Sequence, residues 1–459
     1  MTQRTLSFAY GEEIDARKRN ILRSPKANGS CDVDSIPYLS ALGVSIAERK
    51  QPIQFTPNFS RRIHRWASYV QGFSAWFVES TLRRHRKDYP ELRVLDPFAG
   101  CGTVLVQSKL LGYPSFGTEL NPLLSFIAGV KVNSWDVSPA HLLAAFKSMP
   151  RDMPQDAPWF LRSANQFRPS VLVNLERIRG GISWLEEHEA NRKVLDLLKV
   201  AFCSVLVPCS NLKRTPCLGY SESKVVPSNA PWHLFEAKVR TIANDLTTIQ
   251  RTFKDRIPVE SRVLCEDAME YRHEQKFDLA ITSPPYMNGL DYVMNYKIEM
   301  GWLGFVTDQK SLKRIKDSMV VCDNVSKGLV RDFTSRTNAY TNDWIENICA
   351  DISSNIERRG AYRRTDMPYV VAKYFDDLHR VMGNVSSSLN PGGRFVLVVG
   401  DSLIADVYVP TDLILARIGT ELGLQIETIE KARSRRSGQV RSYRLRETVV
   451  TLKKPNAHE

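Results

Sequence analysis

One short segment, residues 93–103, constrains the fold of this 459-residue chain more than any other. An apolar run there ends in Asp-Pro-Phe-Ala-Gly-Cys-Gly-Thr, and residues of helical character follow as far as Leu111. This order predicts a strand, a glycine loop and a helix. A second strand is expected at residues 115–118, ending directly before Glu119, with a further helix at 123–130. Such alternation predicts a parallel α/β sheet.

The same alternation returns in the second half of the chain. Strands are expected at residues 262–265 and 277–281, then a helix at 369–389, a turn at 390–393 and a strand at 394–399. A helix at 410–422 precedes a closing antiparallel pair, 425–429 with 447–452, whose basic tip spans 431–446. The expected fold is a doubly wound, mostly parallel, Rossmann-like sheet with that closing pair and two insertions.

Composition shifts along the chain divide it into six expected segments. Helices at residues 139–148, 171–187, 192–206 and 232–253 make the first insertion mainly helical, and a polar, Arg-rich stretch forms the second. The segments are an N-terminal arm 1–54, a cofactor-binding part 55–134, the helical insertion 135–260, a catalytic part 261–306, the polar basic insertion 307–366 and a C-terminal part 367–459.

Charge and cysteine usage restrict the function classes. The 63 Lys and Arg residues outnumber the 50 Asp and Glu residues, and this excess favours a phosphate polyanion as partner, although each basic cluster alone is more often a solvated helix face or loop. The eight cysteines form no CxxC pair, so we expect no metal site and no disulfide framework. No apolar run of about 18 residues appears, so we expect no membrane span and a cytoplasmic location.

The glycine loop and the acidic residue after the second strand together predict a nucleoside ligand. Gly100 and Gly102 let the backbone approach a ligand, although glycines in such a turn also occur as turn residues only. Glu119 is placed to accept both hydroxyls of a ribose. The loop lacks the third glycine of a dinucleotide site, and Asp96 would repel a pyrophosphate. A ligand with a cationic amino-acid end and a nucleoside end fits better, as in S-adenosylmethionine.

A second motif, Thr-Ser-Pro-Pro-Tyr at residues 282–286, follows the strand at 277–281. Its prolines fix φ and remove backbone donors, which leaves carbonyl groups free to face a substrate. A base amine could donate hydrogen bonds to the Ser283 side chain and to a main-chain carbonyl, while Tyr286 stacks on the ring. A rigid, solvent-facing turn is the alternative.

The two motifs resemble those of the amino-methylating DNA methyltransferases (cytosine-N4 or adenine-N6). In that family the Ser-Pro-Pro-Tyr form is typical of enzymes that act on cytosine N4. Residues 66–74 resemble the segment that closes over the methionine end of the cofactor, and residues 393–401 resemble a strand that lines the base pocket. The resemblance implies catalytic residues Ser283, Pro284, Pro285 and Tyr286. It implies a cofactor site of Phe73, Ser74, Asp96, Pro97, Phe98, Ala99, Gly100, Gly102, Thr103, Glu119, Asn121, Asp267 and Ala268.

The activity implied by this resemblance is transfer of a methyl group from S-adenosylmethionine to N4 of a flipped cytosine in double-stranded DNA. It also implies a bacterial or archaeal restriction-modification or related defence setting, in which a cognate restriction endonuclease acts separately. Adenine-N6 methylation, structured-RNA base methylation and an inactive DNA-binding subunit remain alternatives. Cytosine-C5 chemistry needs a nucleophilic cysteine. The Pro-Cys pairs at 208–209 and 216–217 follow no strand of the expected sheet.

Sequence recognition is expected in an insertion, because a closed catalytic core has little surface with which to read neighbouring base pairs. Residues 206–232 and 307–366 both qualify, and we favour the second, with an exposed helical lid as the alternative. The motif order, cofactor region first, differs from that of many cytosine-N4 members and leaves the recognition site open. The candidate DNA-binding residues are Arg358, Arg359, Arg363, Arg364, Arg435 and Arg436.

Overall fold

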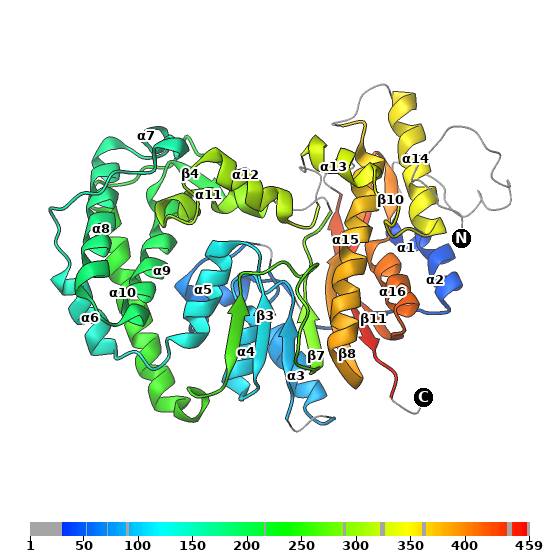
Figure 1. The fold of residues 1–459 in the computed structure, drawn as a ribbon, viewed down its shortest axis with the longest axis horizontal. Helices are drawn as coiled ribbons and strands as arrows, with labels where there is room; N and C mark the ends of the chain where they lie inside the picture. Colours follow the sequence, from blue (N-terminus) through cyan, green and yellow to red (C-terminus); the bar gives the residue numbers. More distant parts are fainter. Residues whose placement is uncertain are drawn as a thin grey trace. The chain divides into compact units, whose positions relative to one another are not determined.

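The computed structural model describes residues 30–456 except 52, 71, 89–90, 215–216, 288–290, 322–325, 360–363 and 438–442. The chain divides into two compact units (Figure 1). The first unit comprises residues 1–53, 268–289 and 319–459, and the second comprises 54–267 and 290–318. One boundary divides the expected segment 307–366, because residues 307–318 belong to the second unit and residues 319–366 belong to the first.

The first unit is built on strands in the order β1-β11-β12-β8-β7. Strand β7 pairs in parallel with β8, β8 and β11 both pair antiparallel with β12, and β1 pairs in parallel with β11. The strands are β1 (Ile46–Glu48), β7 (Phe277–Thr282), β8 (Leu389–Gly400), β11 (Gln425–Arg436) and β12 (Arg444–Lys453), and a small hairpin joins β9 (Ser402–Ile404) to β10 (Val407–Val409).

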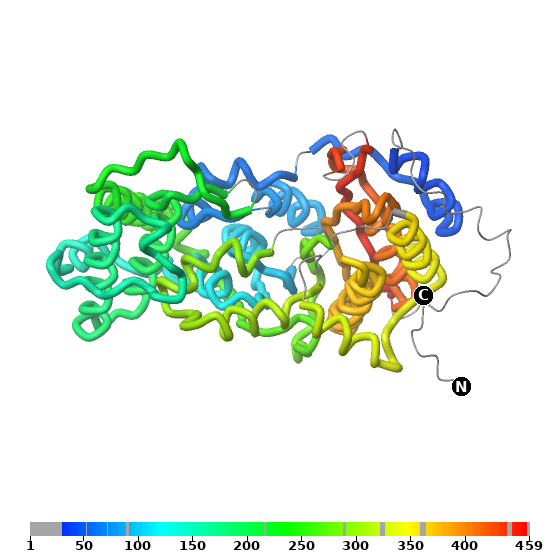
Figure 2. The backbone as a smooth tube through the Cα atoms, turned by 90° about the horizontal axis from the view of Figure 1, so that it is seen from above, coloured from blue at the N-terminus to red at the C-terminus, as the bar shows by residue number. Residues whose placement is uncertain are grey.

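Helices α15 and α16 pack on this sheet, and α13 and α14 pack on α15. The short helix α1 contacts β12 and α2 contacts α16, so residues 31–42 lie beside the last strand and helix of the unit (Figure 2). The helices are α1 (Cys31–Asp34), α2 (Ile36–Leu42), α13 (Lys327–Thr334), α14 (Asp343–Arg359), α15 (Met367–Ser388) and α16 (Thr411–Glu421).

The second unit holds three parallel strands in the order β2-β3-β6 with helices on them. The chain alternates through β2 (Val94–Asp96), α4 (Thr103–Leu111), β3 (Ser115–Thr118) and α5 (Pro122–Asn133) before it returns at β6 (Ser261–Leu264). Because the strands are parallel, Asp96, Glu119 and the residues after Leu264 meet at one edge. The main-chain N–H of Glu119 donates to the carbonyl of Leu264 at 2.9 Å.

The remaining helices of the second unit include a helical cluster, in which α10 packs against α6, α8 and α9. Figure 1 labels this cluster, and α11 contacts α9 and α5. The elements are 3-10 turns at Thr56–Ser60, His64–Trp66, Trp159–Leu161 and Lys254–Arg256, α3 (Ala75–His85), α6 (Pro139–Ser148), α7 (Ser163–Gln166), α8 (Pro169–His188), α9 (Arg192–Cys209), hairpin β4 (Leu212–Arg214) and β5 (Leu218–Tyr220), α10 (Ala230–Thr252), α11 (Tyr292–Trp302) and α12 (Gln309–Ser318).

The predicted fold class is confirmed: both units are α/β, β11–β12 is the closing antiparallel pair, and, apart from the two small hairpins, four of the six strand pairings described above are parallel. The predicted turn at 390–393 lies within β8 as a bulge, since the register with β7 passes from Phe277–Leu389 directly to Leu279–Arg394. The part of the N-terminal arm that is described carries a strand, β1. No helix in the described part of the chain is long and apolar enough to cross a membrane.

Candidate functional site

The glycine loop of the second unit follows β2 and precedes α4, the order that the sequence predicts. Gly100 and Gly102 have φ values of +51° and +83°, which disfavour residues with a side chain. A Cβ on Gly100 would lie 2.7 Å from the Tyr69 hydroxyl, and one on Gly102 would lie 3.0 Å from the Ala128 Cβ in α5. Gly102 therefore permits close packing of α4 on α5, while Gly100 leaves room for Tyr69.

Glu119 ties the loop to the end of β3. Its Oε2 accepts the main-chain N–H of Gly100 at 2.9 Å, and its Oε1 accepts that of Asn121 at 2.8 Å. Burial raises the pKa of the Glu119 carboxyl to about 7, although the hydrogen bonds from these two N–H groups act to lower it. Each carboxylate oxygen can still accept another hydrogen bond, because an ionised carboxylate offers about four acceptor sites.

The other predicted cofactor residues of this unit surround the same edge. Asp96 is buried and accepts the Phe98 N–H at 3.1 Å, while the Pro97 carbonyl accepts the Thr118 hydroxyl at 2.8 Å. Asn121 caps α5 through its Oδ1, and its buried Nδ2 has no hydrogen-bond partner among the described residues. An acidic acceptor beside an orphaned donor fits a nucleoside with vicinal hydroxyls, so these residues fit S-adenosylmethionine.

The remaining predicted cofactor residues divide between the two units. Ala99 and Thr103 lie in the loop and at the start of α4, Phe73 is 8% exposed, and the Ser74 side chain caps α3. Asp267 is half-buried and is the last residue of the first of the two chain segments that form the second unit. Ala268 belongs to the first unit, where its carbonyl accepts a hydrogen bond from Asn384 at 2.8 Å.

Sequence reasoning missed an aromatic group beside the loop. The Tyr69 ring stacks on Tyr292 and Tyr296, with ring centroids 6.2 and 6.3 Å apart. The Tyr296 hydroxyl accepts the main-chain N–H of Val70 at 3.2 Å, which anchors the segment before Gly72. Tyr292 and Tyr296 follow the catalytic motif in sequence by fewer than a dozen residues, but nothing local links them to Tyr69.

The Ser-Pro-Pro-Tyr motif lies in the first unit, directly after β7. The Tyr374 hydroxyl of α15 donates to the Pro285 carbonyl at 2.9 Å, and the Tyr286 hydroxyl donates to Glu447 Oε1 at 2.6 Å. Burial, then the charge of Glu447, raises the pKa of Tyr286 well above its usual value, while a hydrogen bond from Ser283 lowers it. The Ser283 hydroxyl oxygen has lone pairs that can accept from a donor such as a base amine.

The candidate cysteine nucleophile Cys209 ends α9, where burial raises the pKa of its thiol to about 12. A nucleophilic cysteine needs a lowered thiol pKa, so the environment of Cys209 opposes cytosine-C5 chemistry there. Cys217 is exposed next to β4–β5 and follows residues that lie outside the described part of the chain.

The predicted DNA-binding arginines have different surroundings. Arg358 is exposed at the end of α14, Arg364 pairs with Asp366 at 2.7 Å, and Arg435 donates to the Asp401 carbonyl. Arg436 is exposed near the tip of the β11–β12 hairpin. Arg363 lies outside the described residues, as does the side chain of Arg359.

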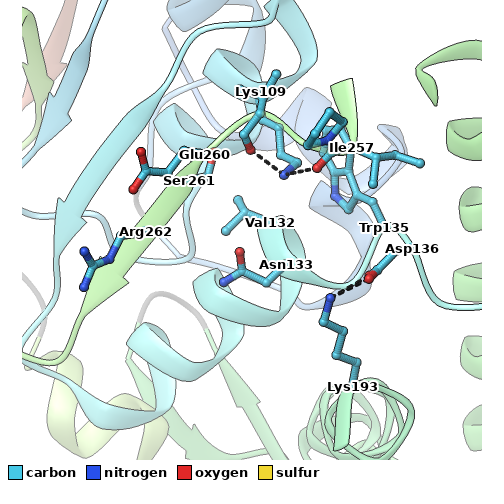
Figure 3. Close-up of a pocket in the computed structure, with 12 residues that line it drawn as sticks. Lys109, Val132, Asn133, Trp135, Asp136, Lys193, Ile257, Glu260, Ser261 and Arg262 are labelled. Carbon is cyan, nitrogen blue, oxygen red and sulfur yellow. Dashed lines mark hydrogen bonds and ion pairs between the residues drawn. The ribbon is translucent and has the colours of Figure 1, made fainter. Parts of the chain in front are cut away.

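A cavity of about 420 Å³ lies in the second unit at the amino end of β6 (Figure 3). Lys109 donates there to the carbonyls of Ile257 and Val259 at 3.0 and 2.8 Å, and Lys193 pairs with Asp136 at 2.6 Å. Open α/β sheets bind ligands at the carboxyl ends of their strands, and these cations already have partners. We therefore assign this cavity no part in the reaction.

Comparisons with known proteins identify relatives over most of the chain. The type II methyltransferase M.BsoBI of Geobacillus stearothermophilus is 23% identical, covering 88% of this chain and 88% of the relative. M.AvaI of Nostoc sp. is 22% identical, covering 82% of each chain, and M.MvaI of Kocuria varians is 20% identical, covering 83% of this chain and 86% of its own. No family model matches.

Cofactor affinity is expected to depend on pH through Glu119. A ribose diol donates to the ionised carboxylate, and a carboxyl with a pKa of about 7 is mostly protonated at pH 6. Binding of S-adenosylmethionine, measured by calorimetry, should therefore weaken roughly tenfold between pH 8 and pH 6. Glu119→Gln should bind weakly and lose this dependence on the carboxyl. Equal pH profiles for the wild type and Glu119→Gln would contradict the assignment.

Proposed function

We infer that this chain, which belongs to the amino-methyltransferase family and uses S-adenosylmethionine, methylates the exocyclic N4 of a cytosine flipped out of double-stranded DNA. The observation that carries this inference is the Ser-Pro-Pro-Tyr motif at the carboxyl end of β7, held by Tyr374 and Glu447. We propose that the protein works in the cytoplasm of a bacterial or archaeal cell in a restriction-modification setting. A separate cognate endonuclease is part of that proposal.

The protein's task in this reaction is to position a poor nucleophile, since the lone pair of the cytosine amine is delocalised into the ring. The Ser283 oxygen and the Pro284 carbonyl accept hydrogen bonds from the two amine hydrogens, which directs the lone pair outward. Tyr286 stacks on the flipped ring and offsets part of the unstacking cost. The bound cofactor supplies a methyl group that its sulfonium charge already activates.

The expected product is N4-methylcytosine. Purified protein incubated with unmethylated DNA and isotopically labelled S-adenosylmethionine, followed by mass analysis of the nucleosides, should place the label on cytosine. Label on N6-methyladenine would overturn the choice of base, although not the methyl transfer. Label only in structured RNA would overturn the DNA substrate, and no transfer with retained DNA binding would favour an inactive subunit.

We propose that residues 307–366 contribute to DNA recognition, with Arg358 among the residues that bind the phosphates. Ile345, Ile348, Ile352 and Ile356 are buried on one face of α14, while Arg358 is exposed on that helix. Arg358 donates to Asn355 at 2.8 Å, which holds its guanidinium beside the helix end.

Replacing Arg358 and Arg359 together with alanine should flatten the salt dependence of DNA binding. Each phosphate that the protein no longer neutralises removes about 0.9 from the slope of log affinity against log salt. Arg394→Ala is the matched control, because Arg394 lies outside residues 307–366 and its guanidinium pairs with Glu427 at 2.9 Å. A double variant with wild-type affinity and slope would transfer the role to residues 206–232 of the helical insertion.

A further inference from the structure

A chain of polar contacts leads from the catalytic motif to the edge of the β11–β12 hairpin. The Tyr286 hydroxyl donates to Glu447 Oε1 at 2.6 Å, and Arg433 Nε donates to Glu447 Oε2. The Glu447 side chain is 7% exposed, whereas that of Arg433 is 42% exposed. Both oxygens of a nearly buried carboxylate are thus engaged, one by the tyrosine of the motif and one by a cation.

The sheet register places these residues side by side. Glu447 of β12 lies opposite Arg433 of β11 on one side and opposite Gly400 of β8 on the other. A Cβ on Gly400 would lie 3.0 Å from Cε2 of Tyr286, so the tyrosine ring covers this glycine. The glycine makes room for the ring, and Glu447 receives its hydroxyl from the neighbouring strand.

Two kinds of contact are needed to hold a tyrosine ring in one orientation. One fixes the direction in which the ring axis points, and the other limits rotation of the ring plane about that axis. The hydrogen bond to Glu447 fixes the direction of the Cβ–Oη axis, and the contact with Gly400 restricts rotation of the ring about it. At the other end, the bond from Tyr374 to the Pro285 carbonyl holds the backbone just before Tyr286. The ring is therefore preorganised as a stacking platform before any base arrives.

Charge explains why a glutamate is suited to this place. A hydrogen bond to an ionised acceptor is roughly twice as strong as a neutral one. Burying an unpaired carboxylate is costly, and Arg433 offsets this cost. During methyl transfer the methyl carbon exchanges its bond to sulfur for a bond to the amine nitrogen, and the base carries a positive charge until the amine loses a proton to solvent. A phenol that donates to a carboxylate presents an electron-rich face to that charge.

We propose that Glu447 is a positioning residue for the reaction, which acts on the flipped base through Tyr286 and is held in turn by Arg433. This inference rests on the proposed function, because it takes Tyr286 as the surface on which the base stacks. Neither motif comparison nor local sequence indicates Glu447, which lies 161 residues from Tyr286.

The test is a double-mutant cycle on the rate of a single turnover, with saturating DNA and labelled cofactor. Glu447→Gln and Tyr286→Phe keep the size of each side chain but remove the charge or the donor. Each should slow methyl transfer by about 10-fold to 100-fold while the Kd for cofactor stays unchanged. The combined variant should be no slower than the slower single variant, because both changes break the same interaction. Arg433→Met should slow the step less.

Glu427→Gln is the matched control and should leave the rate unchanged. This glutamate of β11 lies away from the motif and forms an ion pair with Arg394 at 2.9 Å. Effects of Glu447→Gln and Tyr286→Phe that multiply, or a wild-type rate in Glu447→Gln, would overturn the inference. Thermal unfolding of each variant separates a folding defect from a slower step. If the wild type methylated adenine and the cycle were still non-additive, only the choice of cytosine would be overturned. If the wild type transferred no methyl group, the proposed function and the role of Glu447 would both be overturned.

Discussion

Arg446→Met is expected to lower the free energy of unfolding of the first unit by about 3–5 kcal/mol at neutral pH, the cost of breaking a buried ion pair. Arg446 is fully buried between two carboxylates, with Nε 2.8 Å from Asp412 and 3.4 Å from Asp401. It also donates to the Ser35 hydroxyl at 2.8 Å, which ties the N-terminal helices to β12. Methionine would leave two buried carboxyls with no cation beside them.

The pH dependence of that loss gives a second readout. Burial raises the pKa of Asp412, but the attraction of Arg446 more than offsets it and leaves the pKa below its usual value. In the wild type this carboxylate therefore contributes stability that is lost as the pH falls. Without Arg446, its attraction and its hydrogen bonds are lost while burial still raises the pKa of Asp412. We therefore expect this pKa to rise above the unfolded value, so the variant should gain stability as the pH falls from 8 to 5.

Denaturant unfolding at both pH values measures this prediction. Arg394→Met is the control, because its ion pair with Glu427 is partly exposed and such pairs contribute only about 0–1 kcal/mol. A loss under about 1 kcal/mol in Arg446→Met, unchanged between pH 5 and pH 8, would show that the two carboxyls tolerate burial without the cation.

Arg446 also shows where charge patterns fail as a guide. In the sequence it belongs to the basic tip 431–446, which predicts a surface that attracts phosphate. The structure buries it completely, so this part of the prediction is wrong. The reason lies in its partners: Asp401 and Asp412 are 45 and 34 residues away, and no local pattern pairs them with one particular arginine among several.

The glycine loop could be predicted because its signals are local. Strand, turn and helix follow within 20 residues, and the positive φ of Gly100 and Gly102 is a property of the turn itself. Strand β1 could not be predicted from the sequence, because a segment of three residues shows no recognisable periodicity. Its conformation depends on pairing with β11. The hydrogen bond from Tyr286 to Glu447 was equally hidden. In contrast, the buried isoleucines of α14 stand at helical spacing, so that helix could have been predicted.

Tyr286→Ala should show the largest loss of activity, with kcat reduced by about 100-fold and cofactor affinity kept. Truncating an aromatic platform costs about 1–3 kcal/mol per stacked base, and each 1.4 kcal/mol is a factor of ten in rate. The change also leaves Glu447 without its tyrosine donor. Ser283→Ala removes one neutral hydrogen bond to the amine and should reduce kcat by only about tenfold.

Tyr443→Phe is the matched control for the hydrogen bond that Tyr286 makes. Tyr443 belongs to the same unit and lies outside residues 307–366. Its hydroxyl donates to the Asp34 carboxylate at 2.6 Å, so the change removes the same kind of hydrogen bond away from the motif. At saturating DNA its kcat should stay close to that of the wild type. Calorimetric measurement of cofactor affinity shows whether Tyr286 serves the base or the cofactor. Tyr286 belongs to the first unit, whereas the glycine loop and Glu119 belong to the second. If Tyr286→Ala lost cofactor binding but still bound the target DNA, the tyrosine would serve the cofactor and the base would need another platform.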